Sequence, residues 1–236
     1  MTLGVRDQPC FESGVINGDY KTIKRPGGPF NGPTRLDTTE EGDIFIADGY
    51  NNCCVHHFSK NGKLLHSWGA PGSAPGAFNI VHSLKIDPRT GDIYIADREN
   101  RRVQIFTQDG RLKEIWDDLN RPTDVSFYGD YVFVSQLGEK LFTDYVNYDY
   151  HLRNHCSHVG IYNRDGKMVG DIGTEDIGAS GNFMAAHCVC TDSTGAVYVG
   201  EVNNYDIASL FTAFPYGKGW PGERHPGVQK FVMAEQ

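Results

Sequence analysis

An internal repeat constrains the fold of this 236-residue chain more than any other feature of its sequence. The string Gly-Asp-Ile-Phe-Ile-Ala-Asp at residues 42–48 returns as Gly-Asp-Ile-Tyr-Ile-Ala-Asp at residues 91–97. Two weaker copies begin at Gly129 and Gly195. Each copy is a run of β-branched and aromatic residues entered through a glycine turn, which is typical of a buried strand. The chain is therefore expected to fold as a series of similar units.

The segments around each copy repeat as well. A short apolar segment precedes each copy, and another follows it, such as Val-His-His-Phe at residues 55–58. In three copies a turn with Asn-Gly or Asp-Gly comes next, and these pairs favour a two-residue hairpin. One unit is then four antiparallel strands, which predicts an all-β fold of β-propeller blades in a single domain. The four blades are expected at about residues 30–69, 78–117, 119–173 and 183–236.

Three segments fall outside the common unit. The third and fourth units carry insertions at about residues 138–157 and 204–226, which are expected on the rim of a propeller, where function tends to collect. The fourth unit has no outer strand after residues 228–232, and residues 1–5 resemble such a strand cut short. Either the N-terminus completes the last blade and closes a ring of four, or the chain is part of a larger propeller. The first arrangement is the one we expect.

Composition and charge exclude several classes of function. The chain has 22 Lys and Arg against 30 Asp and Glu, so its negative charge argues against a nucleic-acid partner. No run of about 18 apolar residues occurs, which predicts no membrane-spanning helix. Residues 1–14 lack the regions of a signal peptide, and the compartment stays open. The six cysteines are expected to be reduced thiols, with a disulfide of Cys10 or Cys156 open for an exported protein.

Two histidines occupy the same place in the repeat. Alignment of the four units puts Thr34, His82, Thr123 and His187 at the start of the innermost strand, which lines the channel of a propeller. We therefore expect His82 and His187 at one end of the channel, either sharing a metal ion or bridged by water. Imidazole suits zinc, and a catalytic zinc has three protein ligands. The candidates for a third ligand are His151, His155, His158 and Cys188.

Two further candidates follow the second strand of adjacent units. Tyr50 and Arg98 are therefore expected on the same rim. An arginine there can bind a carboxylate through two hydrogen bonds, and a tyrosine near a metal can act as a general base. The alternative is structural, with Arg98 paired with Glu99 or Asp97 and Tyr50 packed on a turn.

Other polar residues are interpreted as structural. Asp48, Asp97 and Glu201 recur at the end of the second strand, which indicates a turn or an inter-blade hydrogen bond more than catalysis. The basic run at residues 98–102 is expected on an exposed, salt-bridged blade edge or against an anionic ligand.

The repeats also resemble a known family. The strings at residues 48–52 and 96–106 look like NHL repeats, and the whole chain resembles the catalytic core of the peptidyl-α-hydroxyglycine α-amidating lyases and their bacterial relatives. The resemblance implies a six-bladed propeller, of which this chain is similar to the last four blades. It also implies cleavage of the carbon–nitrogen bond of a peptidyl-α-hydroxyglycine, giving a peptide amide and glyoxylate. The motifs that carry it stand at residues 30–34, 47–50, 78–84, 96–100 and 186–187.

The same resemblance implies metals and site residues. The family enzyme uses a zinc ion held by three histidines and a structural calcium ion. His82 and His187 match two of the zinc positions, Tyr50 matches the catalytic base, and Arg98 matches an arginine of the substrate site. The third zinc histidine belongs to blades that this sequence lacks. The residue after the last zinc histidine is normally an acidic calcium ligand, and here it is Cys188.

Two functions from different classes are consistent with these residues. The first is a metal-dependent lyase of the amidating type, or a related enzyme, acting on a peptide or another small substrate. The second is a non-catalytic NHL propeller that binds a peptide or protein on the rim that carries the insertions. Unpaired edge strands on a four-blade chain also predict a protein partner or self-association.

Overall fold

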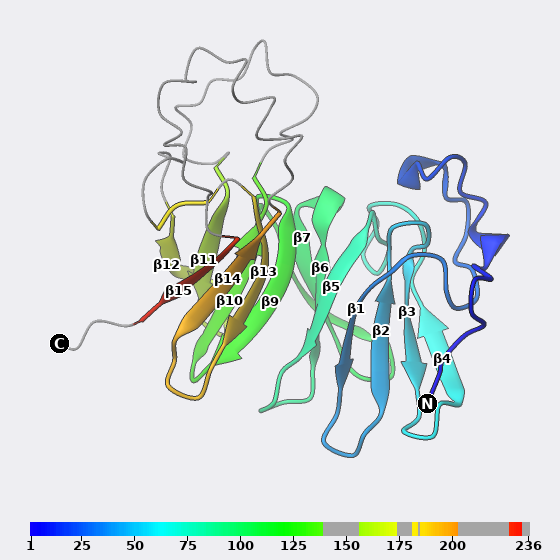
Figure 1. The fold of residues 1–236 in the computed structure, drawn as a ribbon, viewed down its shortest axis with the longest axis horizontal. Coiled ribbons are helices and arrows are strands. Elements are labelled where there is room, and N and C mark those ends of the chain that lie inside the picture. Colours follow the sequence, from blue (N-terminus) through cyan, green and yellow to red (C-terminus); the bar gives the residue numbers. More distant parts are fainter. Residues whose placement is uncertain (139–155, 174–180, 184, 203–226, 233–236) are drawn as a thin grey trace, which may run out of the picture. The chain divides into compact units, whose positions relative to one another are not determined.

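The computed structural model describes residues 1–138, 156–173, 181–183, 185–202 and 227–232. These residues form antiparallel β-sheets joined by turns and three short 3-10 helices (Figure 1). None of the helices in the described ranges has the length and hydrophobicity that crossing a membrane requires. The 3-10 helices are η1 (Phe11–Ser13), η2 (Tyr20–Thr22) and η3 (Arg98–Asn100).

The strands pair in sequence order within four sheets. The first two sheets have the orders β1-β2-β3-β4 and β5-β6-β7-β8, the third has the order β12-β11-β10-β9, and the fourth comprises β13-β14-β15. The strands are β1 (Pro33–Thr38), β2 (Ile44–Asp48), β3 (Cys54–Phe58), β4 (Leu64–Trp68), β5 (Val81–Ile86), β6 (Ile93–Asp97), β7 (Arg102–Phe106), β8 (Leu112–Trp116), β9 (Pro122–Tyr128), β10 (Tyr131–Gln136), β11 (His158–Tyr162), β12 (Met168–Ile172), β13 (Ala186–Thr191), β14 (Val197–Glu201) and β15 (Val228–Phe231).

Glycines form the outer turns as the sequence predicts. Gly62, Gly110 and Gly166 have φ angles of 79°, 82° and 76°. Only glycine adopts this left-handed conformation without a steric penalty. Each of these glycines therefore lies in a turn that joins the third strand of a sheet to the fourth, as predicted. The turns are not the expected two-residue hairpins, because Asn61, Asp109 and Asp165 lack the positive φ of such a turn and the pairing register shifts before each turn.

The chain divides into two compact units, Met1–Val125 and Ser126–Gln236, with the boundary inside β9. Each unit has an apolar core, built mainly from buried residues of its strands. The core of the first unit contains Phe45, Ala47, Val55, Phe78, Val81, Leu84, Ile86, Ile93, Ile95 and Phe106. The core of the second unit contains Phe133, Val159, Phe183, Ala186, Val189, Val197 and Val199.

The first strand of three sheets is bulged at its second residue. The pairing register shifts on either side of Thr34 in β1, His82 in β5 and His187 in β13. A bulge takes one residue out of the ladder and redirects its side chain. The structure therefore gives the two histidines the same local geometry, as their shared place in the repeat predicts.

The N-terminus differs from the prediction. Residues 1–5 form no strand, because Gly4 has a left-handed φ of 78° that an extended strand does not accommodate. Met1 lies instead against the β3–β4 turn, where a Cβ added to Gly62 would be 2.7 Å from Met1 Sδ. The expected closing strand is therefore not formed. The insertion at residues 204–226 and most of the one at residues 138–157 lie outside the described residues.

Candidate functional site

Tyr50 and His82 contact each other in the first unit. Tyr50 follows the end of β2, and its hydroxyl oxygen is 3.2 Å from Nε2 of His82 at the bulge of β5. Nδ1 of His82 is 2.7 Å from the backbone oxygen of Thr123. A carbonyl oxygen only accepts hydrogen bonds, so in the neutral ring Nδ1 carries the proton and Nε2 keeps a lone pair. Metal-binding histidines are commonly oriented in this way.

Arg98 completes the group. Its guanidinium carbon lies 5.8 Å from the centre of the Tyr50 ring. Its Nε is 2.9 Å from Oε1 of Glu99, and Arg121 reaches the same oxygen at 2.6 Å. Burial opposes ionisation of Glu99, but hydrogen bonds and charge from Arg121 and Arg98 hold the pKa of Glu99 below its ordinary value. The pairing of Arg98 with Glu99 therefore fixes the guanidinium beside Tyr50.

Three of the four predicted site residues thus lie together in one unit. His82 is buried, whereas the Tyr50 side chain beside it is 41% exposed, so solvent reaches this group from the Tyr50 side. His187 is half-buried in β13 of the other unit, and Cys188 next to it is exposed. His158, half-buried in β11, has Nδ1 3.0 Å from the backbone oxygen of Cys156. The other two candidate ligands, His151 and His155, lie outside the described residues.

The donor chemistry fits zinc better than calcium. His82 offers one nitrogen in the tautomer that a zinc ligand needs. Within the part of the chain that the structure describes, no three His, Cys, Asp or Glu side chains are grouped to hold a metal ion. Calcium takes oxygen ligands, and Cys188 offers a thiol, so this position does not fit calcium.

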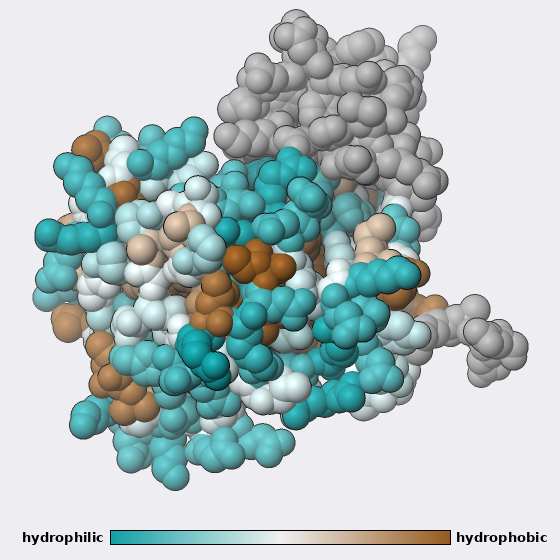
Figure 2. Space-filling model, turned by 180° about the vertical axis from the view of Figure 1, so that it is seen from behind, coloured by the Kyte–Doolittle hydropathy of each residue, from teal (hydrophilic) through white to brown (hydrophobic). Residues whose placement is uncertain are grey.

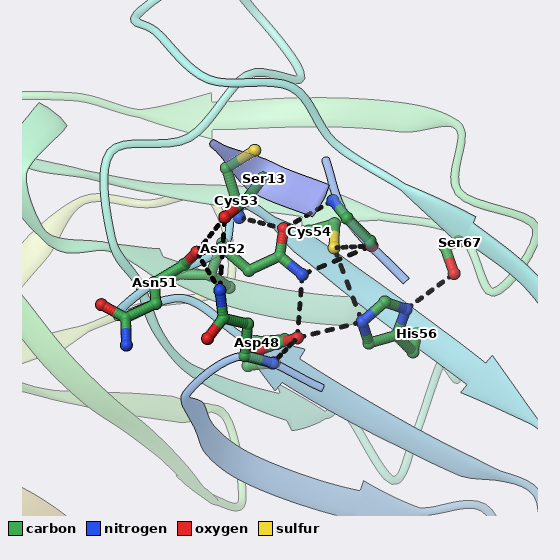
Figure 3. Close-up of polar contacts among 12 residues, drawn as sticks. Ser13, Asp48, Asn51, Asn52, Cys53, Cys54, His56 and Ser67 are labelled. Carbon is green, nitrogen blue, oxygen red and sulfur yellow. Dashed lines mark hydrogen bonds and ion pairs between the residues drawn. The ribbon is translucent and has the colours of Figure 1, made fainter. Parts of the chain in front are cut away.

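A buried polar network holds both ends of the turn that carries Tyr50 (Figure 3). The fully buried Asp48 carboxylate accepts hydrogen bonds at 2.9 Å from the backbone nitrogen of Asn31 and from Nδ2 of Asn52. Nε2 of His56 lies 3.3 Å from the same carboxylate, and Nδ1 of His56 lies 2.7 Å from the Ser67 hydroxyl. Asp48 and Asn52 flank Tyr50 in the sequence, so the network fixes the backbone on both sides of the tyrosine.

Asp97 has the same role for the turn that carries Arg98. Its carboxylate, also fully buried, accepts from the backbone nitrogen of Asn79 and from Nδ2 of Asn100, both at 2.8 Å. Arg102 Nε donates at 2.8 Å, and Gln104 Nε2 at 3.1 Å. Burial raises the pKa of Asp97 to about 6, although these hydrogen bonds and the charge of Arg102 act in the opposite direction.

The recurring carboxylates and Arg102 all have partners within the protein. Glu201 accepts a hydrogen bond from Gln229 at 3.1 Å, so all three recurring carboxylates, with Asp48 and Asp97, have structural partners. The expectation of an exposed basic edge is wrong for Arg102, which is 6% exposed. Its guanidinium is folded inward because Asp97 and three backbone oxygens accept its hydrogen bonds.

A family model described as "6-bladed beta-propeller" matches residues 29–155 of the chain. The chain belongs to this family of six-bladed β-propellers. The fold class predicted from the repeats is confirmed, and the antiparallel sheets are propeller blades.

The curated relatives of this propeller include amidating enzymes and NHL repeat proteins. Peptidyl-glycine alpha-amidating monooxygenase B of Xenopus laevis is 31% identical over 170 residues, which are 69% of this chain and 18% of that protein. Peptidyl-alpha-hydroxyglycine alpha-amidating lyase 1 of Drosophila melanogaster is 38% identical over 88 residues, 34% of this chain and 16% of that protein. NHL repeat-containing protein 3 of Homo sapiens is 35% identical over 117 residues, 46% of this chain and 33% of that protein. The propeller thus spans a third or less of the length of each of these relatives.

Solved structures support the fold alone. A protein of unknown function from Bacteroides caccae superimposes with a TM-score of 0.56 at 13% identity, covering 84% of this chain and 62% of that one. At this identity the similarity concerns the propeller architecture and not the site.

Sequence reasoning missed two features of the Tyr50 group. Glu99 and Arg121 together fix Arg98, but they are 22 residues apart, and only the fold brings them together. The backbone oxygen of Thr123 sets the tautomer of His82. Thr123 occupies the same repeat position as His82 in the next unit. This shared position was the sequence feature that could have indicated a contact between the two first strands.

Proposed function

We propose that this propeller is a metal-dependent lyase that cleaves the carbon–nitrogen bond of a peptidyl-α-hydroxyglycine or a related small N-acyl-α-hydroxyglycine. The observation that carries the proposal is the contact of the Tyr50 hydroxyl with the lone-pair nitrogen of His82, with Arg98 beside the tyrosine ring. The names of the amidating relatives support the reaction class.

The substrate carries a carboxylate, a hydroxyl group and an amide nitrogen on one carbon atom. Because Arg98 uses Nε for Glu99, its terminal nitrogens are the donors suited to the substrate carboxylate. Tyr50, once its hydroxyl has lost its own proton, takes the proton of the substrate hydroxyl. The released O–H electron pair forms the carbonyl of glyoxylate, the C–N pair goes to nitrogen, and that nitrogen takes a proton to give the amide. No oxidant is needed.

A zinc ion would be held by His82 through Nε2, while His187, the other predicted ligand, belongs to the second unit. Bound zinc supplies positive charge that polarises the hydroxyl oxygen of a substrate. The part played by this chain is orientation, because the hydrogen bond from Nδ1 of His82 to Thr123 fixes both the ring and its tautomer.

Glyoxylate release from an N-acyl-α-hydroxyglycine tests the proposal. With added zinc, the wild-type protein should release glyoxylate, and Tyr50→Phe and His82→Gln should each lower kcat/KM by about 10²–10⁴-fold. Tyr131→Phe is the matched control, because Tyr131 is a similarly exposed tyrosine (44%) on β10. Wild-type protein that releases no glyoxylate with zinc present, or Tyr50→Phe protein with full activity, would overturn the proposal.

The second candidate function is a non-catalytic NHL propeller that binds a peptide or protein. The similarity to NHL repeat-containing protein 3 favours it. On the described part of the face in Figure 2, apolar side chains form small separate groups on a mainly hydrophilic surface, which gives this face no large apolar patch for a partner. This function predicts that a glycine-extended peptide binds without turnover and that Tyr50→Phe leaves its affinity unchanged.

A further inference from the structure

Two histidines face each other across the outer strands of the first blade. His57 on β3 pairs directly with His66 on β4. Their ring centres are 5.0 Å apart and the ring planes are nearly perpendicular, at 85°. Phe45 stacks on His57 at 4.0 Å, and Trp68 stacks on His66 at 5.4 Å, so both rings are held by aromatic neighbours.

Each of these rings has one engaged nitrogen and one without a partner. Nε2 of His57 lies 3.0 Å from Oδ2 of Asp43, while Nδ1 of His57 is buried with no hydrogen-bond partner. His66 hydrogen bonds with the backbone of Gln108, and its Nε2 is buried with no partner. A carboxylate and a backbone oxygen both accept, so in the neutral rings the protons sit on the engaged nitrogens. Two lone pairs are therefore left, one on each of two rings whose centres are 5.0 Å apart.

This arrangement matches the requirements of a metal ion. Metal–nitrogen distances of about 2.0–2.1 Å and a tetrahedral angle place the centres of two bound imidazoles about 5 Å apart. We propose that His57 Nδ1 and His66 Nε2 together bind a divalent transition-metal ion, Cu²⁺, Ni²⁺ or Zn²⁺, at a site separate from Tyr50 and His82.

The surroundings favour this class of ion. Imidazole is a preferred ligand of copper, nickel and zinc, and Cu²⁺ binds most tightly of the three. Asp43 orients His57 as a carboxylate orients many metal-bound histidines.

Trp68 provides a direct readout, because its ring stacks on His66. Titration of the folded protein with Cu²⁺ should quench Trp68 fluorescence, and Trp68→Phe should remove that part of the signal. His66→Gln should weaken Cu²⁺ binding by about tenfold or more. His82→Gln is the matched control and should leave the quenching unchanged, which separates this site from the proposed lyase site.

NMR of the wild-type protein supplies a test that needs no variant to fold. Zn²⁺ should shift the imidazole signals of His57 and His66 together, at the same metal concentration. Absence of Cu²⁺ quenching in wild-type protein, equal affinity in His66→Gln, or unshifted signals of His57 and His66 would each overturn the proposal. None of these results bears on glyoxylate release by the Tyr50 group.

Discussion

Arg102 offers a sharp test of the buried charges that support the candidate site. Its Nε donates to Asp97, and its terminal nitrogens donate to the backbone oxygens of Ser73, Ala74 and Ala77. Arg102→Met removes these hydrogen bonds and leaves the Asp97 charge buried without its cation. Loss of one partner of a buried ion pair typically costs about 3–5 kcal/mol of the free energy of unfolding. We expect that loss at neutral pH.

The pH dependence makes the prediction specific to Asp97. Burial raises its folded pKa from 3.8 to about 6, so the folded protein binds more protons than the unfolded chain between these values. This group therefore makes the free energy of unfolding fall as pH rises from about 4 to about 6, by about 3 kcal/mol in all. Arg102 lowers the pKa of Asp97, so Arg102→Met raises it further, and the variant keeps losing stability above pH 6.

The stability deficit of Arg102→Met should therefore be larger at pH 8 than at pH 5, by about 1–3 kcal/mol. Urea denaturation followed by circular dichroism at both pH values measures it. Arg111→Met is the control, because Arg111 is exposed in a β7–β8 turn and should show little change at either pH. Adding Asp97→Asn to Arg102→Met should remove the extra loss at pH 8. An equal deficit at the two pH values would refute the reasoning.

Two further predictions concern close packing and thiol chemistry in the first blade. A Cβ at Gly49 would lie 2.0 Å from the backbone oxygen of Val81, whereas one at Gly72, despite a φ of 126°, meets nothing within 4 Å. Gly49→Ala should therefore lower the thermal midpoint much more than Gly72→Ala, which should cost about 1 kcal/mol; equal midpoints would contradict the packing argument. Burial raises the pKa of Cys53 to about 12, while Cys190 is exposed. Iodoacetamide at pH 8 should label Cys190 but not Cys53 in the native protein, and peptide mass spectrometry that finds equal labelling would show that Cys53 is accessible.

The strands and hairpin turns were predictable because short-range chemistry determines them. Local rules of burial predict the β-branched runs that form β2 and β6. Local rules of backbone conformation predict the turn at Asn61-Gly62. The proximity of Tyr50 and Arg98 was also predictable, because both follow the second strand of adjacent repeats and so lie on the same rim.

Other features depended on contacts that no periodicity marks. The Ser13 hydroxyl reaches the backbone oxygen of Asn51 because the N-terminal segment contacts the first blade, and residues 6–29 belong to no repeat. Arg102 looked like part of an exposed basic run, but its long side chain reaches backbone oxygens 25 or more residues earlier in the chain. Neither contact has a local signal, since both depend on how a loop crosses a blade.

Through its hydrogen bond to Thr123, the His82 side chain both links two neighbouring first strands and orients the nitrogen that faces Tyr50. Thr34 donates to the backbone oxygen of Val81 at 2.8 Å, and His82 donates in the same way to Thr123, one first strand further along. These two bulged residues therefore fasten each first strand to the next. Any displacement of β9 at Thr123 would turn the imidazole and move the nitrogen that faces Tyr50. The orientation of the His82 ring thus depends on the spacing of neighbouring strands. A change far from Tyr50 that alters this spacing would therefore change the contact between His82 and the Tyr50 hydroxyl.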